Sequence, residues 1–499
     1  MRTNRTCGLI VAVLVGLGVL ATTVSGEPSD GWVSLFDGKS LDGWTVSENP
    51  STFKVVDGTI AVDGPRAHAF YSGPVRGGQF KNFEFRCDVR TQSGANSGVF
   101  FHTQVQSGPG WPARGYEVQI NNSQPAHGNY YEHKKTGSLY GIRNVYKSPV
   151  ADGQWFTLHI MVRGKHIQVR VNDTLTVDYI EPARPARGPK RDGRTLSSGT
   201  FALQGHDPSS RVAFRNIQVK PLPDGLADDA GGPVPDQEEH ADVLALSMGN
   251  FPVLDLHAHL KGGLKIEDVE ALSRRTGIGY GVAPNCGVGF PITDDKGIEA
   301  FAASMKGRCV FLGMQAEGRE WVKAFSPKAV ALFDYVFTDS MTFTDDRTGK
   351  RTRLWVDGEY EVGDKQQFMD MLVSKIESIC DREPIDIYVN PTFLPRPIAG
   401  EYDALWTSER MKKVVAALAR NGVAMEINAR YKLPSPAFIK LARQAGVKFT
   451  FGTNNGGKGD LVAPAYCLEM VRECKLTPKD LFVPGSGGKK AVERKAMPK

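Results

Sequence analysis

Hydrophobic and polar residues alternate with a period of two through the first part of the chain. The alternating runs are separated by Gly, Asn, Asp and Pro turns, with no helical pattern between them. Such runs predict strands that have one buried and one polar face. Many strands without intervening helices indicate a β-sandwich. The predicted strands are 52–56, 83–89, 98–104, 116–121, 155–163, 166–171, 200–204 and 212–219.

The pattern changes after about residue 240, where short apolar runs alternate with amphipathic helical stretches. Seven such β-α units in a row predict a parallel barrel or a doubly wound sheet. The predicted strands are 253–256, 279–283, 310–314, 335–337, 385–389, 424–427 and 448–451. The clearest predicted helices are 266–275, 366–380, 409–420 and 435–444.

These patterns divide the chain into four segments. Arg2 and Arg5 precede an apolar run at 9–21 and then small residues, the order of a secretory signal peptide, here residues 1–26. The alternative is an uncleaved membrane anchor, although the run is short for a spanning helix. The sandwich follows at 27–221, then a Pro- and Gly-containing linker at 222–240, expected to be extended and solvated, and the barrel at 241–499. We therefore expect a secreted or periplasmic protein with no membrane span in the mature chain.

The composition excludes few classes of protein, but it argues against a nucleic-acid partner. The 499 residues are 41% hydrophobic and 23% charged, which is ordinary for a globular protein. The formal net charge of +6 is small for this length, and no basic stripe with interleaved aromatic residues is present. The oligomeric state cannot be inferred from the sequence.

Several predicted strands of the sandwich carry a polar face rich in amide, carboxylate and imidazole groups. In 116–121, Glu117 and Gln119 point opposite to the apolar residues, and Gln204 does the same in its own strand. His102 is placed on a polar face by the same alternation. Such groups suit sugar hydroxyls, which need paired donors and acceptors. The alternative is that this face is only the solvated side of a sandwich.

Five motifs give the first domain a resemblance to a known family. They are Leu35-Phe36-Asp37-Gly38-Lys39-Ser40-Leu41-Asp42-Gly43-Trp44, Asn96-Ser97-Gly98-Val99-Phe100-Phe101, Gly115-Tyr116-Glu117-Val118-Gln119-Ile120, Thr136-Gly137-Ser138-Leu139-Tyr140-Gly141 and Leu203-Gln204-Gly205-His206-Asp207. With these motifs, residues 31–221 resemble the 3-keto-disaccharide hydrolases. The resemblance implies a concanavalin-like jelly-roll sandwich and a saccharide or glycoside substrate.

The chemistry implied by this resemblance is cleavage of glycosides already oxidised at C3. A ketone at C3 acidifies the proton on C2, so a base can remove it and the group on C1 can leave; water can add afterwards. The reaction needs a base, an acid and a group that holds the enolate. The expected catalytic residues are Glu117, His206, His102 and Asp207, with Glu117 and His206 as the main proton handlers. The expected substrate-binding residues are Asn96, Gln119, Tyr140, Gln204 and Trp111. His68, His127 and His133 are expected in surface loops.

The second domain carries an H-x-H motif at the end of its first predicted strand. His257 and His259 point the same way on a strand and can bind one metal ion. The alternative is a chance pair. In this motif the domain resembles the polymerase and histidinol phosphatase (PHP) superfamily, which implies a (βα)7-type barrel with two or three metal ions. Glu317 matches a carboxylate ligand of that family, and Glu426-Ile427-Asn428 matches a late-strand motif.

The departures from the family pattern predict a weakened metal site. Asn390-Pro391 stands where the family has His-Pro, and Thr453-Asn454-Asn455-Gly456 stands where it has Ser-Asp-x-His. We therefore expect at most one divalent ion, Zn or Mn, on His257, His259 and Glu317, with Asp339 as a further ligand. The alternative is an inactive barrel kept for binding or architecture.

Three hypotheses for the whole protein follow. The first is an exported sugar-degrading enzyme, a hydrolase or lyase whose activity lies in the sandwich. The second is a non-catalytic carbohydrate-binding sandwich fused to a PHP-like metal-dependent phosphoesterase or other hydrolase. The third is a structural or surface protein with both sites silent. A common groove for His102, Glu117 and His206 would favour the first.

Overall fold

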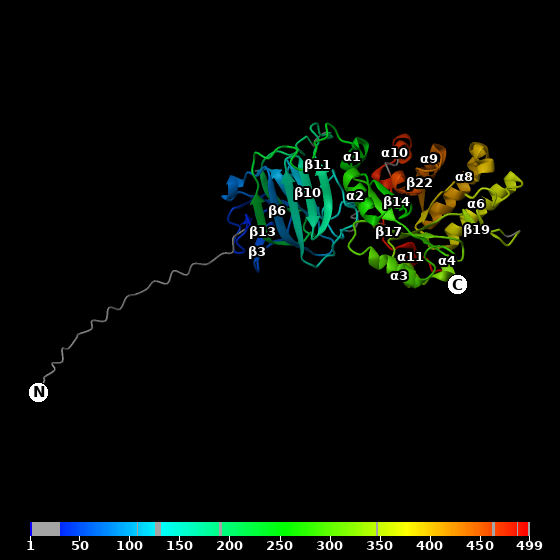
Figure 1. Cartoon of the computed structure of the whole chain (residues 1–499), viewed down its shortest axis with the longest axis horizontal. Helices are drawn as coiled ribbons and strands as arrows, with labels where there is room; N and C mark the ends of the chain where they lie inside the picture. The colour runs from blue at the N-terminus through cyan, green and yellow to red at the C-terminus, as the bar shows by residue number, and fades with distance from the viewer. Residues whose placement is uncertain are drawn as a thin grey trace.

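A computed structural model describes residues 1, 30–106, 108–124, 131–188, 192–345, 348–461, 465–486 and 488–497. The signal-peptide prediction and His127 therefore lie outside the described residues, apart from Met1. Within the described residues, no helix combines the length and apolar character needed to cross a bilayer. Two bodies lie side by side, an all-β body and an α/β body (Figure 1).

The first body is a sandwich of two antiparallel sheets, as the alternation predicted. The larger sheet has the order β11-β10-β9-β6-β13-β4-β3, and β1 also pairs with β13. Phe83, Phe85 and Phe201 pack in the layer between the two sheets. The strands of the larger sheet are β1 (Val33–Ser34), β3 (Phe53–Val56), β4 (Thr59–Val62), β6 (Phe83–Thr91), β9 (Phe156–Arg163), β10 (His166–Val171), β11 (Thr174–Ile180) and β13 (Val212–Pro221).

The smaller sheet supplies the polar face. Its order is β2-β5-β12-β7-β8, with strands β2 (Trp44–Ser47), β5 (Ala67–Tyr71), β7 (Ser97–Thr103), β8 (Tyr116–Ile120) and β12 (Thr200–Gly205). In β8, Val118 and Ile120 belong to the hydrophobic core, and Glu117 and Gln119 point to the opposite side. Both sides are buried here, because loops cover the polar face as well.

The segment between the two bodies follows the surface of the sandwich. The Lys165 N–H donates to the Asp228 carbonyl at 2.8 Å, and the Ala183 N–H donates to the Pro235 carbonyl at 2.8 Å. Near its end, the Tyr179 hydroxyl donates to Glu238 Oε1 at 2.6 Å. The segment therefore docks on the sandwich at several points, while its residues remain exposed or partly exposed to solvent as expected.

The second body is a closed parallel barrel. Seven strands form a ring in the order β15-β14-β23-β22-β21-β18-β17, and the pairing of β17 with β15 closes it. This closure selects the barrel over the doubly wound sheet. The ring strands are β14 (Leu254–Ala258), β15 (Gly279–Val282), β17 (Phe311–Ala316), β18 (Tyr335–Thr338), β21 (Ile387–Tyr388), β22 (Ala424–Asn428) and β23 (Phe449–Gly452); β16 (Asn285–Cys286) pairs with the outer part of β17.

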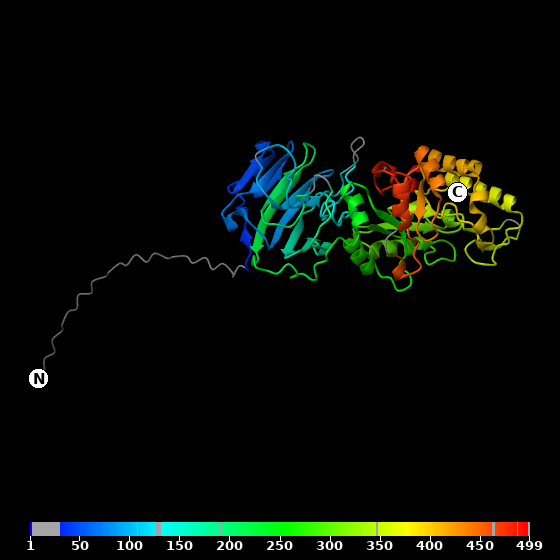
Figure 2. The same ribbon diagram turned by 90° about the horizontal axis from the view of Figure 1, so that it is seen from above.

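Helices flank the barrel, as Figures 1 and 2 show. The four predicted helices are present as α2 (Ile266–Thr276), α6 (Lys365–Arg382), α8 (Ser408–Asn421) and α9 (Pro436–Gln444). Further helices are α1 (Ala241–Met248), α3 (Asp295–Ser304), α4 (Trp321–Ala324), α5 (Pro327–Val330), α7 (Tyr402–Leu405), α10 (Ala465–Glu473) and α11 (Ala491–Arg494), and a hairpin is formed by β19 (Thr342–Thr344) and β20 (Arg351–Arg353).

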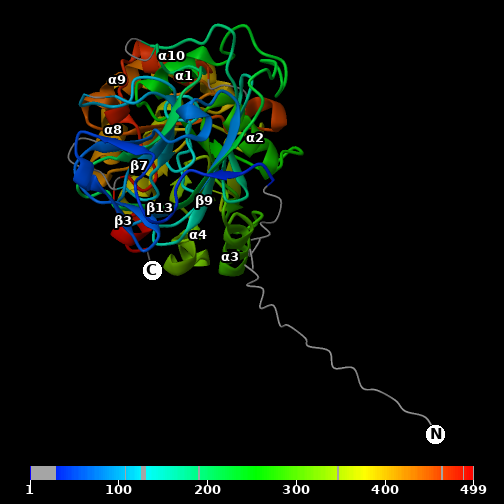
Figure 3. The same cartoon turned by 90° about the vertical axis from the view of Figure 1, so that its left-hand side faces the viewer.

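The sandwich packs against the amino ends of the barrel strands. Figure 3, viewed from the sandwich side, shows the sandwich in front of the second body. Tyr146 of the sandwich packs with Leu254, the first residue of β14, and its hydroxyl accepts from the Val253 N–H at 3.3 Å. A Cβ on Gly279, at the start of β15, would lie 2.5 Å from the Tyr146 ring, so this glycine leaves room for it. The Lys147 ammonium also donates to Asp334 Oδ2 at 2.6 Å, just before β18. The carboxyl ends of the strands, where barrel active sites lie, therefore remain uncovered by the sandwich.

Candidate active site

A cavity of about 380 Å³ opens over the polar face of the smaller sheet. This volume is within the range of small-molecule sites. Strands β7, β8 and β12 form its floor, and loops form its walls. The lining residues are Asn96, Trp111, Pro112, Ala113, Glu117, Gln119, Glu132, Tyr140, Arg194, Gln204 and His206. The structure thus brings seven of the predicted sandwich-site residues into one cavity.

Glu117 lies at the floor of this cavity on β8. Its Oε1 accepts a hydrogen bond from Gln204 Nε2 at 2.9 Å, across from β12. Gly98 on β7 leaves the space for this carboxylate, because a Cβ there would lie 2.8 Å from Glu117 Oε1. Burial raises the pKa of Glu117 to about 7, against the opposing effects of the Arg194 charge and the Gln204 hydrogen bond. A carboxyl group with such a pKa can exchange a proton near neutral pH.

Two amide side chains beside Glu117 have an unused acceptor. Gln119 Nε2 donates to Asn96 Oδ1 at 3.0 Å, which fixes both side chains. The Oε1 atoms of Gln119 and Gln204 are buried without a hydrogen-bond partner in the described part of the chain. Since a buried acceptor without a partner costs free energy, these oxygens suit the hydroxyl groups of a bound ligand.

His206 stands on the wall of the cavity and is oriented by its neighbour Asp207. The His206 Nδ1 and Asp207 Oδ2 atoms are 2.7 Å apart, and the indole of Trp111 packs against the imidazole with ring centroids 5.1 Å apart. Burial raises the pKa of Asp207, but hydrogen bonds from Ser209, His206 and Ser210 outweigh it and lower the pKa to about 2. Asp207 itself is not among the residues that line the cavity; its carboxylate contacts the His206 imidazole that does.

Glu132 and Arg194 were missed by the sequence reasoning. The Tyr140 hydroxyl donates to Glu132 Oε2 at 2.8 Å, and the buried Lys134 ammonium donates to Glu132 Oε1 at 3.1 Å. Both Glu132 and Arg194 come from irregular segments, where no alternation indicates which way a side chain points. The only signal for Glu132 was its closeness to the Tyr140 motif.

His102 does not line the cavity, although the alternation placed it on the polar face. Between Phe100 and Thr103, β7 holds one residue more than its partner β12, and His102 has a φ of +55°. This β-bulge turns the imidazole into the sandwich. Its Nε2 lies 2.9 Å from the Lys81 carbonyl, and its Nδ1 accepts from the Ser197 N–H at 3.1 Å. Both ring nitrogens are therefore occupied by the backbone.

Two other histidines are buried rather than exposed as predicted. His68 lies within β5 and is fully buried, with its ring edge against Phe100 and Trp111. Burial lowers its pKa to about 4, so the ring is neutral at neutral pH. His133 is buried in the irregular segment before Tyr140. No strand was predicted at residues 67–71, because all five residues of β5 are buried and the strand therefore shows no alternation of apolar and polar positions.

A second cavity, of about 360 Å³, opens at the carboxyl ends of the barrel strands. Its floor is mostly polar and buried, and its rim carries two cations and two aromatic side chains. The lining residues are His259, Lys261, Asn285, Gln315, Glu317, Asp339, Met341, Trp355, Asn390, Arg430, Tyr431, Asn454 and Gly456. Of the predicted metal ligands, His259, Glu317 and Asp339 line this cavity, and His257 lies just below it.

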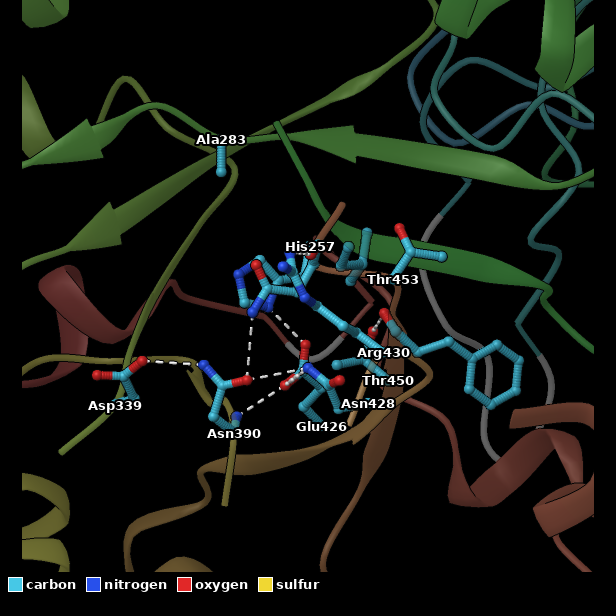
Figure 4. Close-up of polar contacts among 12 residues, drawn as sticks. His257, Ala283, Asp339, Asn390, Glu426, Asn428, Arg430, Thr450 and Thr453 are labelled. Atoms are coloured by element: carbon cyan, nitrogen blue, oxygen red, sulfur yellow. Dashed lines mark hydrogen bonds and ion pairs between the residues drawn. The ribbon is translucent and has the colours of Figure 1, made fainter. Parts of the chain in front are cut away.

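An amide network connects the strand ends beneath this second cavity (Figure 4). His257 Nδ1 is 2.5 Å from Glu426 Oε1, and Glu426 Oε2 accepts from the Asn390 N–H at 2.7 Å. The Asn390 side chain donates to Asp339 Oδ2 at 2.9 Å and accepts from Asn428 Nδ2 at 3.0 Å. Asn390 thus uses its amide to join the acid on β18 to the asparagine on β22.

Part of the predicted metal-ligand set is already hydrogen-bonded to other side chains, whereas His257 Nε2 is buried without a hydrogen-bond partner in the described part of the chain. Glu317 already accepts from Asn285 at 2.7 Å and from Thr342 at 3.1 Å, and Asp339 accepts from the Asn390 amide. Burial and the nearby Asp339 charge raise the pKa of Glu317 to about 7. Within the described residues, no three His, Cys, Asp or Glu side chains converge as metal ligands would. Neutral amides therefore satisfy the carboxylates that a metal ion would otherwise bridge.

Comparison with known proteins identifies the first domain. Residues 31–220 match the sequence profile of the 3-keto-alpha-glucoside-1,2-lyase-like domain, which confirms the resemblance found in the motifs. A 3-keto-disaccharide hydrolase from Bacteroides thetaiotaomicron is 26% identical over 171 residues. That stretch is 30% of this chain and 59% of the relative, so the chain spans less than two thirds of the relative's length.

Two solved structures are similar to parts of the chain. A candidate glycosyl hydrolase from Parabacteroides distasonis ATCC 8503 is 21% identical, with a TM-score of 0.33, and covers 39% of this chain and 94% of its own. The histidinol phosphate phosphatase of Lactococcus lactis subsp. lactis Il1403, solved with zinc, L-histidinol and phosphate, is 12% identical, with a TM-score of 0.34. It covers 47% of this chain and 98% of its own. The barrel architecture rests on the strand pairing described above, not on this similarity.

Proposed function

We propose that the sandwich cavity cleaves glycosides that carry a ketone at C3. The observation that carries this proposal is the buried Glu117 carboxyl group, whose pKa is about 7, at the floor of a cavity lined with sugar-binding amides. The match of residues 31–220 to a 3-keto-alpha-glucoside-1,2-lyase-like domain supports it. The substrate class is therefore an oxidised glycoside, not an ordinary one.

Glu117 is the proposed base. Its carboxylate takes the proton from C2 of the substrate, the C2–H electrons form a C1=C2 double bond, and the C1–O bond breaks. The leaving oxygen takes up a proton, and the ring that remains is an unsaturated 3-keto sugar. Water can then add across this double bond, so that the net reaction is hydrolysis. The base acts only when it is ionised, so catalysis should rise with pH through about 7.

His206 is the proposed acid, and Arg194 is the proposed group that stabilises the enolate. His206 Nδ1 faces Asp207, so Nε2 is the ring nitrogen on the cavity side, where it can protonate the leaving oxygen. The Arg194 guanidinium lies close enough to Glu117 to lower its pKa, so it can also stabilise negative charge on the C3 oxygen. Trp111 gives a flat apolar surface beside His206 for the sugar ring.

Release of p-nitrophenol from p-nitrophenyl 3-keto-glucoside tests the proposal on the full-length protein. We expect turnover of the keto-glycoside and none of p-nitrophenyl glucoside itself. In deuterium oxide, recovered substrate or product should carry deuterium at C2 if the proton is removed first. Turnover without C2 exchange would indicate direct hydrolysis. Saturable binding of the keto-glycoside without any turnover would favour a non-catalytic carbohydrate-binding sandwich.

We also propose that the protein is exported from the cytoplasm by a signal peptide. The positive start and the apolar run at 9–21 support a signal peptide that is removed near Gly26. N-terminal sequencing of protein recovered from the periplasm or the medium tests it, and a start near residue 27 is the expected result. Recovery of an intact N-terminus from the membrane fraction would instead support an anchor.

A further inference from the structure

The barrel cavity takes no part in the function proposed for the sandwich, yet it is as large as the sandwich cavity. We propose that it binds a monosaccharide carboxylate, such as a hexuronate or an aldonate, through side chains alone and without a metal ion. The proposal rests on four features of the cavity: a cationic rim, a buried floor of amides and acids, two aromatic side chains at the mouth, and a loop of glycines whose N–H groups are already hydrogen-bonded.

The rim carries two positive charges near each other. Arg430 donates from Nη1 to the Asn454 carbonyl at 2.9 Å, and its guanidinium lies 5.7 Å from the centroid of the Tyr431 ring. Lys261 also lines the cavity, on the loop after β14, where its backbone N–H donates to the His259 carbonyl at 3.0 Å. Both side chains are exposed and line the cavity. Such a pair attracts one anionic group to the mouth.

The floor offers hydrogen-bonding groups that suit sugar hydroxyls. His259 Nδ1 lies 2.7 Å from the Ala283 carbonyl, which can only accept, so Nδ1 carries the proton and Nε2 is an acceptor. Gln315 Oε1 is buried without a partner in the described part of the chain. Asn285 and Asn390 add amides to the same wall. Hydroxyl groups can donate to these acceptors, and a metal ion is not needed to bind them.

Two aromatic side chains stand at the same mouth. Trp355 is 39% exposed, and Tyr431 is held by an edge-on contact with Phe393, with ring centroids 5.1 Å apart. Exposed aromatic faces beside polar groups are suited to the C–H faces of sugar rings. The ligand should therefore combine hydroxyl groups, an apolar ring face and a negative charge.

The loop that contains Gly456 and Gly457 favours a carboxylate over a phosphate as the anionic group of the ligand. The Gly456 and Gly457 N–H groups, which could hold phosphate oxygens, both donate to Asp460 Oδ2 at 2.6 and 3.2 Å. Glu317 and Asp339 also face the cavity, and these acids repel a dianion more than a monoanion. One carboxylate matched by Lys261 and Arg430 fits this distribution of charge.

Calorimetric titration of the full-length protein in EDTA tests the inference. We expect sodium D-glucuronate to bind with a 1:1 stoichiometry and D-glucose to bind at least about tenfold more weakly. Arg430→Gln and Lys261→Gln should each weaken glucuronate binding about tenfold, which corresponds to about 1.4 kcal/mol. Lys413→Gln is the matched control, since Lys413 is exposed on α8 and pairs with Glu409.

Several results would overturn the inference. These are no detectable binding of glucuronate, equal binding by the Arg430 and Lys261 variants, binding that is lost in EDTA, or tighter binding of glucose 6-phosphate than of glucuronate. Glu117→Gln separates the two cavities, because it should abolish keto-glycoside turnover and leave glucuronate binding unchanged. Loss of glucuronate binding in that variant would assign the ligand to the sandwich and contradict the inference.

Discussion

At the scale of single residues, Glu117 combines burial with a titration near neutral pH. Its pKa is raised from 4.5 to about 7, mainly because burial disfavours the charged form. Between these two pH values the unfolded chain has already released its proton and the folded chain has not. This group therefore lowers the stability of the folded protein as the pH rises from about 4.5 to about 7, and the loss is complete above that range.

Glu117→Gln should consequently reduce activity and increase stability. We expect keto-glycoside turnover to fall about 100-fold or more. At about pH 8 the melting temperature should rise, from a gain of roughly 1–3 kcal/mol. The gain should shrink toward pH 5, where the wild-type carboxyl group is also protonated in the folded state. Scanning calorimetry at both pH values measures this, and a variant less stable than the wild type at pH 8 would contradict the assignment.

His102 and His206 have contrasting surroundings, which predict contrasting effects of substitution. His102 is buried and bonded to the backbone on both sides, whereas His206 stands in the cavity wall. We expect His102→Ala to destabilise the protein by about 1–3 kcal/mol and to leave the pH profile of turnover unchanged. His206→Gln should instead keep the melting temperature and lower kcat, because glutamine cannot protonate the leaving oxygen. A wild-type kcat in His206→Gln would remove His206 from the mechanism.

At the scale of elements, the barrel strands and eight of the thirteen sandwich strands could be predicted from the sequence, whereas β1, β2, β4, β5 and β11 were missed. The floor of each site could be predicted in part. All seven barrel strands coincide with predicted apolar runs, because a strand buried in a barrel is a short apolar stretch between turns. The alternation in β8 also placed Glu117 and Gln119 correctly on one face. It failed in β7, where the bulge at His102 shifts the alternation by one residue. A bulge of this kind has no reliable signal in a single sequence.

The loops and the cross-strand networks could not be predicted. Glu132 and Arg194 reach the sandwich cavity from irregular segments, whose side-chain directions depend on tertiary packing. Likewise, Asn390 differs from a histidine ligand in sequence, but only the folded barrel shows that its amide joins Asp339 and Asn428. The sequence indicated the loss of a ligand, and the structure shows the hydrogen bonds that replace it.

The side chains at the carboxyl ends of the barrel strands are hydrogen-bonded to one another, and this predicts weak or no retention of metal ions by the barrel. After dialysis against EDTA and then against buffer with zinc or manganese, we expect less than one ion per chain by elemental analysis. The melting curve should not move on addition of either metal, since a ligand stabilises a protein only by binding its folded form. His257→Gln serves as the control and should behave identically. Retention of one or more ions per wild-type chain, with loss of those ions in His257→Gln, would show instead that the barrel has a metal site.

At the scale of the whole molecule, the sandwich and the barrel share buried polar contacts. The Lys134 ammonium, which holds Glu132 in the sandwich cavity, also donates to Asn250 Oδ1 just before the barrel. Asn250 has a φ of +61°, a conformation that glycine adopts without strain. The second domain therefore contributes to the positioning of an acid in the first.

Asn250→Gly tests this coupling without disturbing the backbone. Removal of the amide leaves Lys134 with one acceptor fewer, and we expect a loss of about 1–2 kcal/mol in stability. Turnover of the keto-glycoside should fall several-fold through kcat, with KM nearly unchanged, because Glu132 is displaced while the substrate contacts remain. Asn421→Gly, at the carboxyl end of α8 where the amide donates to Asp381, is a control for loss of an amide elsewhere in the barrel. Wild-type kcat in Asn250→Gly would show that the barrel does not influence the sandwich site.

The packing of Tyr146 against the start of β14 has a consequence for how small molecules move between the sandwich cavity and the barrel cavity. The sandwich closes the base of the barrel, and the barrel cavity opens at the far ends of the strands. A sugar released from one cavity must therefore travel through bulk water before it meets the other. An isotope-dilution experiment makes this measurable. With a keto-glycoside whose leaving group is labelled glucuronate, unlabelled glucuronate added during turnover should dilute the label completely before it binds to the barrel. The fusion would then keep the two sites on one molecule and in equal number, with no internal channel between them.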